Sequence, residues 1–172
     1  MPDARPASRA PWIIAAVAGV VFVVALVVYF VPLAHAKDDT TTGQLTTDEM
    51  RATAAAATET ANFSSLSRAH FARDYRRSLA GATGALRKDI ASKRAATLKV
   101  LTAGKFDLSA QVTHSALVGP SAKGDGYVVL VTLAGYKSTA PNTPVQSDLQ
   151  VTVVRHGSSY LASDVTNIGV SG

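Results

Sequence analysis

The 172-residue chain contains no cysteine. Disulfide bridges and thiolate metal sites are therefore excluded, and the stability of the fold must come from packing. The four histidines lie in four different segments, none spaced as ligands on one helix face would be: His35, His70, His114 and His156. The sequence therefore predicts no metal site.

Motifs for phosphate binding and catalysis are also missing. The turn Gly81-Ala82-Thr83-Gly84 does not match a phosphate-binding loop, and we expect Thr83 to cap the helix that follows. Tyr127, Tyr160 and Asp164 lie on predicted strands. They would form an isomerase-like site only if all three faced one cavity, and each has only an even chance of pointing inward. We therefore expect no enzymatic activity, no cofactor and no catalytic residue.

Acidic residues are scarce in the middle of the chain. Between Arg68 and Lys105 there are ten Lys or Arg residues but only Asp74 and Asp89, whereas from Phe106 onward three basic and four acidic residues nearly balance. The net charge of +5 thus belongs mainly to this segment. A basic helical segment is either a solvated surface or a surface that binds anionic lipid headgroups or an acidic partner.

One long apolar run stands near the amino end. Residues Trp12–Val31 contain no charged, amide or hydroxyl side chain except the Tyr29 phenol. A helix of this length rises about 1.5 Å per residue and covers roughly 30 Å, the hydrocarbon thickness of a bilayer. Arg5 and Arg9 precede the run, so residues 1–11 are predicted to stay in the cytoplasm. We predict a transmembrane helix over 12–31, an exported domain beyond it and no nucleic-acid partner.

A second interpretation of this run stays open. Ala34-His35-Ala36 has the small-x-small pattern that signal peptidase cleaves. The apolar region of a secretory signal usually has about 7 to 15 residues, so the longer run favours an uncleaved signal-anchor. Both interpretations export the same domain, 47–172, and residues 32–46 are predicted to be its tether.

The exported domain is expected to begin with helices. Thr46 or Thr47, followed by Asp48 and Glu49, predicts a first helix over about 47–62. An apolar stripe at four-residue spacing predicts a second helix that leaves three arginines on its other side. The stripe is Phe71, Tyr75 and Leu79, and the arginines are Arg73, Arg76 and Arg77.

A third helix is predicted to follow the turn at Gly84 and to continue to about residue 102. Its apolar side contains Leu86, Ile90, Leu98 and Leu101. Gly104 is expected to end it. From Asp107 onward the apolar period changes from about four to two, which is typical of half-buried strands.

Four strands are predicted after this change. They cover about 108–118, 127–133, 149–153 and 159–166. Gly157 and Ser158 form a tight turn between the last two, and the connection from Tyr136 to Gln146, with Pro141 and Pro144, is expected to be an exposed loop. Helices over 47–104 followed by strands over 107–168 predict an α+β domain whose helices cover one face of a curved antiparallel sheet.

This layout of one span, a tether, helices and about four long strands resembles the Mce-associated membrane proteins. Asp74–Gly84 is similar to that family's helix ending in an Ala-Thr-Gly turn, and Leu149–Val165 is similar to its final hairpin. The resemblance implies a cystatin-like cone of the nuclear-transport-factor type. It also implies a non-catalytic accessory that stabilises or positions subunits of an Mce lipid or sterol importer, with Mce proteins and their permeases as partners.

Two other functions stay open. An inner-membrane scaffold of type IV secretion also places a cone-shaped domain outside a single span. A chain cleaved after Ala36 would instead be an exported lipid-binding protein.

Overall fold

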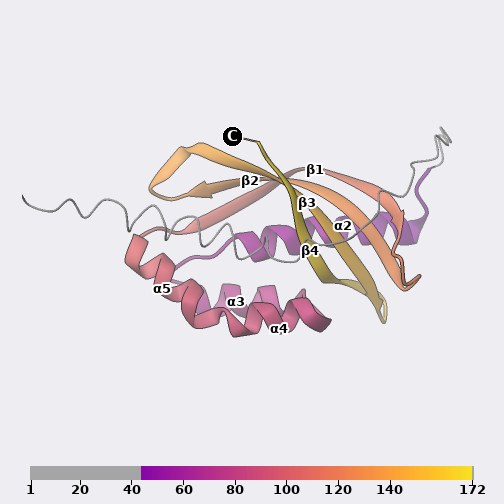
Figure 1. Cartoon of the computed structure of the whole chain (residues 1–172), viewed down its shortest axis with the longest axis horizontal. Coiled ribbons are helices and arrows are strands. Elements are labelled where there is room, and N and C mark those ends of the chain that lie inside the picture. Colours follow the sequence, from indigo (N-terminus) through magenta and orange to yellow (C-terminus); the bar gives the residue numbers. More distant parts are fainter. Residues whose placement is uncertain (1–43, 172) are drawn as a thin grey trace, which may run out of the picture.

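The computed structural model describes residues 44–171 as four helices followed by four strands. The helices are α2 (Thr47–Ser64), α3 (Phe71–Ala80), α4 (Gly84–Ser92) and α5 (Arg94–Gly104). The strands are β1 (Leu108–Pro120), β2 (Gly126–Lys137), β3 (Ala140–His156) and β4 (Ser159–Ser171). All four strands pair antiparallel in the order β1-β2-β3-β4. The α2 helix packs on one face of the curved sheet, with α3, α4 and α5 on the same side (Figure 1), which confirms the predicted α+β architecture.

The predicted cytoplasmic tail (1–11) and transmembrane helix (12–31), with nearly all of the tether (32–46), lie outside the described residues. Within residues 44–171, no helix is both long enough and apolar enough to cross a membrane. The span and its orientation stay predictions.

The first helix begins where the sequence predicts. The Thr46 side chain accepts a hydrogen bond from the Glu49 N–H (3.3 Å), and the Glu49 carboxylate accepts one from the Thr46 N–H (2.7 Å). This capping box satisfies two amide groups that the helix itself leaves unpaired. The Thr46 amide also holds the pKa of Glu49 below its usual value.

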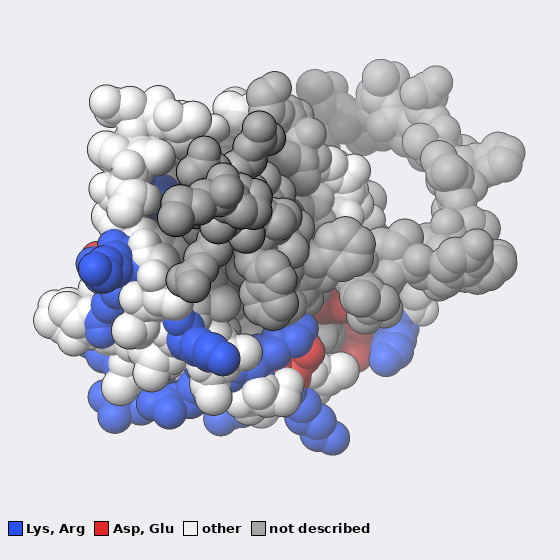
Figure 2. Space-filling view, turned by 60° about the vertical axis from the view of Figure 1, so that its left-hand side comes forward, with Lys and Arg blue, Asp and Glu red and all other residues white. Residues whose placement is uncertain are grey.

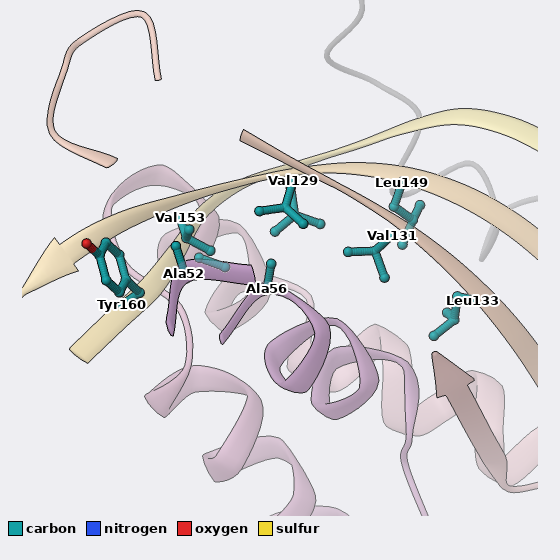
Figure 3. Close-up of a cluster of buried hydrophobic side chains, with 10 residues drawn as sticks. Ala52, Ala56, Val129, Val131, Leu133, Leu149, Val153 and Tyr160 are labelled. Atoms are coloured by element: carbon teal, nitrogen blue, oxygen red, sulfur yellow. The ribbon is translucent and has the colours of Figure 1, made fainter. Parts of the chain in front are cut away.

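The main core lies between α2 and the sheet. Ala52 and Ala56 of α2 are fully buried and face strand residues such as Val129 (Figure 3). Because alanine is small, the α2 backbone lies close to the strands. The inward-facing strand residues are Val129, Val131, Leu133, Leu149, Val151, Val153, Tyr160 and Ala162. Alternate residues on β2 and β3 fill the core, as the period of two predicts.

A second, smaller core joins α3 to α5. Phe71 and Tyr75 are buried there, 5.1 Å apart between ring centroids, together with Leu66 and Leu101. The Tyr75 hydroxyl donates a hydrogen bond to the Ile90 carbonyl. The predicted stripe on the second helix is confirmed, because Leu79 packs half-buried against the same core.

The predicted third helix is wrong in one respect, because it is two helices that meet at Lys93. The Lys93 N–H is shared between the carbonyls of Asp89 (3.3 Å) and Ile90 (3.1 Å), which tightens the last turn of α4. Leu86 on α4 packs against the main core, whereas Leu101 on α5 is buried in the second core. Ile90, also on α4, packs against the second core, so α4 contacts both cores and α5 continues along the second one.

The helix ends also differ from expectation. Gly104 is the last residue of α5, but the left-handed conformation falls on Lys105 (φ 51°). A Cβ on Gly104 would lie 2.3 Å from a ring carbon of Phe106, so this glycine makes room for the ring. Thr83 precedes α4 as predicted, yet its side chain caps no described amide, and its own N–H donates to the Ala162 carbonyl (2.8 Å).

The predicted loop from Tyr136 to Gln146 is instead part of a long hairpin, with β3 beginning at Ala140. Pro141 and Pro144 lie between the pairs Lys137↔Ala140 and Gly135↔Val145, where the register shifts. A proline has no N–H to donate, so both prolines fit this irregular stretch. The expected exposure of residues 141–146 is confirmed.

Candidate functional site: a basic helical surface and its hollow

The basic segment forms one surface on the helical side of the domain. Figure 2 shows Lys and Arg side chains gathered along the lower edge of the molecule, where Figure 1 places α3, α4 and α5. The residues of this basic surface are Arg68, Arg73, Arg76, Arg77, Arg87, Lys88, Lys93, Arg94, Lys99 and Lys105. All except Lys93 are exposed, so their charges can act on molecules in solution or at a membrane.

Two of these arginines are paired with a buried carboxylate. Asp74 is only 4% exposed, and its Oδ1 lies 3.0 Å from a terminal guanidinium nitrogen of Arg73 and 3.8 Å from that of Arg77. Its Oδ2 accepts a hydrogen bond from the Ser67 N–H (3.1 Å). Burial opposes ionisation of Asp74, but the Ser67 amide and the two arginines outweigh it and hold its pKa below the usual value.

Other basic residues also have local partners. Arg68 pairs with Asp107 (3.2 Å), and Lys93 pairs with Asp89 (2.6 Å). The Arg94 guanidinium lies 5.7 and 5.9 Å from the ring centroids of Phe71 and Tyr75, within the range of cation–π contacts. These side chains therefore stabilise the packing of the helices as well as contributing positive charge to the surface.

Among the arginines of the basic surface, Arg76 and Arg87 differ, because neither forms an ion pair or a ring contact within residues 44–171. Arg76 comes from α3 and Arg87 from α4, and both line an open hollow of about 590 Å³. His156 and Ser159, at the β3–β4 turn, line the same hollow. Its apolar part comes from Leu79, Ala80 and Leu161. We call this the Arg76–Arg87 hollow.

Backbone hydrogen bonds fix the walls of the hollow. The Ala162 N–H donates to the Gly81 carbonyl (2.9 Å), and the Thr83 N–H donates to the Ala162 carbonyl (2.8 Å). The connection between α3 and α4 is thereby bonded to the edge of β4. These main-chain contacts hold the backbone of α3 and α4, from which Arg76 and Arg87 extend, beside the β3–β4 hairpin.

A second hollow, of about 420 Å³, lies beside α2. Its charged lining residues, Arg51 and Glu59, have opposite signs, and Tyr160 and Ser159 also reach it. The Glu59 carboxylate accepts a hydrogen bond from the Asn62 amide (3.0 Å). With one charge of each sign, this hollow offers no strong preference for an anion or a cation.

The residues considered for catalysis do not all come together. Tyr127 and Tyr160 meet edge to face with 5.9 Å between ring centroids, and burial raises the pKa of Tyr160. Asp164 is exposed on β4 and accepts a hydrogen bond from the Thr166 hydroxyl (3.1 Å).

The histidines within the described residues are likewise dispersed. His70 lies just before α3, His114 on β1 and His156 at the end of β3, and His35 lies outside the described residues. Among residues 44–171, no group of three His, Asp or Glu side chains is placed to hold a metal ion.

Sequence reasoning found the basic segment but missed the hollow. It grouped Arg73, Arg76 and Arg77 as one face, whereas the structure ties two of them to Asp74 and sends Arg76 to the hollow with Arg87. The spacing of Asp74 and Arg77, three apart on a helix, is the signal that could have separated them. No comparable signal in the sequence indicated that His156 lines the same hollow as Arg76 and Arg87.

The fold defines the structural class of this protein: an α+β domain with a four-stranded antiparallel sheet covered on one face by helices. A family model described as "Uncharacterized protein Rv1363c/MT1408-like" matches residues 11–169. The chain belongs to the Rv1363c/MT1408-like family.

A solved structure of a periplasmic fragment of TraM is similar in fold. Its TM-score is 0.57 at 13% sequence identity, and the match covers 71% of this chain and 98% of that chain. At this identity the likeness shows a shared fold. A search of curated proteins finds no match. The resemblance to Mce-associated membrane proteins stays a prediction.

Proposed function

We propose that this protein is a non-catalytic scaffold whose exported domain docks onto subunits of a larger complex in the cell envelope. One observation carries the proposal. A single family model matches residues 11–169, which include both the apolar run 12–31 and the α+β domain. The similar solved structure is itself a periplasmic fragment, which supports a position outside the cytoplasmic membrane.

Binding rather than catalysis suits the arrangement of side chains. Asp164 is exposed on β4, whereas Tyr160, which meets Tyr127 edge to face, is buried. The strongest chemical feature of the domain is instead its exposed basic surface, which suits attraction to acidic proteins or anionic headgroups.

We infer an Mce lipid or sterol importer as the first candidate complex. The inference depends on the resemblance of Asp74–Gly84 and Leu149–Val165 to Mce-associated proteins and on the cystatin-like cone that it implies. Mce proteins and their permeases would then be the partners, and the chain would stabilise or position them.

A scaffold of a type IV secretion-like system is the second candidate. The fold likeness to the periplasmic fragment of TraM favours it. Both candidates assume a membrane anchor, an exported domain and a non-catalytic role. They differ in the proteins that the domain contacts.

Crosslinking in the native membrane separates them. A tagged full-length chain, crosslinked, extracted in detergent and captured, should bring down Mce proteins or permeases under the first candidate and secretion components under the second. Recovery of the chain alone after crosslinking would contradict both.

The absence of cysteine allows a clean test of topology. Single variants Ser8→Cys and Thr139→Cys would each carry the only thiol in the chain, and Thr139 is exposed at the β2–β3 turn. In intact cells a membrane-impermeant maleimide should label Thr139→Cys and leave Ser8→Cys unlabelled until the membrane is permeabilised. Protection of Thr139→Cys would refute export, and loss of residue 8 from the mature chain would point to cleavage.

A further inference from the structure

We propose that the Arg76–Arg87 hollow is a binding site for a phosphate monoester. The site goes beyond the scaffold role, because it would hold its ligand whichever complex the domain joins. Its parts come from three places in the sequence: Arg76 on α3, Arg87 on α4, and His156 with Ser159 at the β3–β4 turn.

The charge of the hollow calls for an anion. None of the described residues that line it is acidic, and neither arginine has a carboxylate partner within residues 44–171. Their neighbours Arg73 and Arg77 are compensated by Asp74. Two guanidinium groups on one hollow repel each other, and a bound anion converts that repulsion into attraction.

The donors suit phosphate better than a carboxylate. Each guanidinium presents its N–H groups in a planar fork, which binds two oxygens of one anion at once. Ser159 and His156 also line the hollow, and a hydroxyl and an imidazole N–H can donate further hydrogen bonds. A carboxylate has only two oxygens for this set, whereas a phosphate monoester has three terminal oxygens and a higher charge.

The apolar lining indicates that the phosphate is carried on carbon. Leu79 and Leu161 are half-buried and line the hollow together with Ala80. They would contact the carbon atoms next to a phosphate ester, whereas inorganic phosphate has no carbon atoms and would gain no affinity from them. The hollow, of about 590 Å³, is open to solvent, which leaves access for the headgroup of an anionic lipid.

The site is also arranged before any ligand arrives. The hydrogen bonds of Ala162 with Gly81 and Thr83 hold α3, α4 and β4 together. The backbone around the hollow is therefore ordered before binding, and the entropic cost is that of fixing the two exposed arginine side chains.

Titration of the full-length chain in nonionic detergent tests the proposal. The probes are inorganic phosphate, glycerol 3-phosphate and micelles doped with phosphatidic acid, with phosphatidylcholine as the neutral lipid. The double variant Arg76→Gln/Arg87→Gln should weaken binding of glycerol 3-phosphate and phosphatidic acid by about tenfold or more. Inorganic phosphate should bind more weakly than either.

The matched control is Lys88→Gln/Lys99→Gln, which removes the same charge from exposed positions on α4 and α5 that do not line the hollow. It should retain affinity within about twofold, since surface charges away from the site act only at long range. Unchanged melting temperatures in both variants would show that the domain stays folded.

Two results would overturn the proposal. One is no binding of any phosphate probe by the wild-type chain. The other is an equal loss in both double variants, which would mean a diffuse basic surface without a built site. Tighter binding of phosphatidic acid micelles than of glycerol 3-phosphate would identify a lipid headgroup as the source of the phosphate, and equal binding would identify a soluble phosphoester. Either leaves the crosslinking and topology tests of the scaffold role unaffected.

Discussion

Replacement of Asp74 by Asn removes a buried charge without changing the size of the side chain. In the wild-type protein both carboxylate oxygens face donors: the Ser67 N–H at 3.1 Å and the Arg73 guanidinium at 3.0 Å. An asparagine has one oxygen, so its NH₂ group must meet one of these donors. A hydrogen bond to a charged group contributes about 1.5–3 kcal/mol, and we expect a loss of this size in the free energy of unfolding at pH 7.

The loss should depend on pH in a defined direction. The folded protein holds the pKa of Asp74 below its ordinary value of 3.8, because the Ser67 amide, Arg73 and Arg77 outweigh the opposing effect of burial. A carboxylate with a lowered folded-state pKa stabilises the fold above its unfolded pKa and loses this contribution as the pH falls through the folded value. The difference between wild type and Asp74→Asn should therefore be full at pH 7 and shrink below about pH 4.

Urea unfolding of the full-length chain in mild detergent, followed by circular dichroism at several pH values, measures this. Asp89→Asn is the control, because it breaks the exposed i,i+4 pair with Lys93, for which about 0.3–0.5 kcal/mol is expected. An Asp74→Asn protein as stable as wild type at pH 7 would refute the reasoning. A loss of equal size at every pH would assign the effect to packing instead of charge.

Three further predictions concern helix ends and are tested by thermal unfolding. Thr46→Ala removes the capping side chain of α2 and should cost about 1 kcal/mol, whereas Thr47→Ala one residue later should cost much less; equal losses would argue against the cap. Lys105→Gly relieves a left-handed conformation (φ 51°) and should add about 1 kcal/mol of stability. Gly104→Ala places a Cβ against Phe106 and should destabilise by about 1–3 kcal/mol, so the same sign at both positions would contradict the assignment.

The parts of the fold that depend on nearby residues were predictable from the sequence. Thr46 and Glu49 lie within one helix turn, and Phe71 and Tyr75 recur at one spacing, so both patterns could be recognised without knowing the tertiary structure. The break at Lys93 was not predictable in this way. Lys93 follows a helix whose Leu86 and Ile90 pack against two different cores, and helix propensity carries no information on such tertiary contacts.

The prediction of a loop between β2 and β3 was wrong for a related reason. Two prolines in eleven residues favour a loop by composition, but Pro141 and Pro144 both fall in the stretch where β3 is out of register with β2. Whether a proline interrupts a sheet depends on which amide groups point to the neighbouring strand. That information exists only once the strands are paired.

The candidate site combines both kinds of information. A count of charges located the basic segment. Which arginines lack an ion pair depends on Asp74, which is buried on α3, and their position beside β4 depends on the hydrogen bond from the Thr83 N–H to the Ala162 carbonyl. This hydrogen bond brings α4 to β4 and completes the hollow with His156. Residues that are 80 positions apart, such as Arg76 and His156, become neighbours through one short backbone bridge.

The length of the predicted tether limits how far the Arg76–Arg87 hollow can lie from the membrane. Fifteen residues, 32–46, span at most about 50 Å when fully extended, so an anchored domain stays within roughly twice its own diameter of the membrane. At that distance the local concentration of headgroups is high, and a weak phosphate site is enough to orient the basic surface toward the bilayer. Cleavage after Ala36 would remove this advantage, and the same hollow would then have to bind its phosphoester by affinity alone. A weak affinity for glycerol 3-phosphate would therefore suit an anchored chain better than a released one.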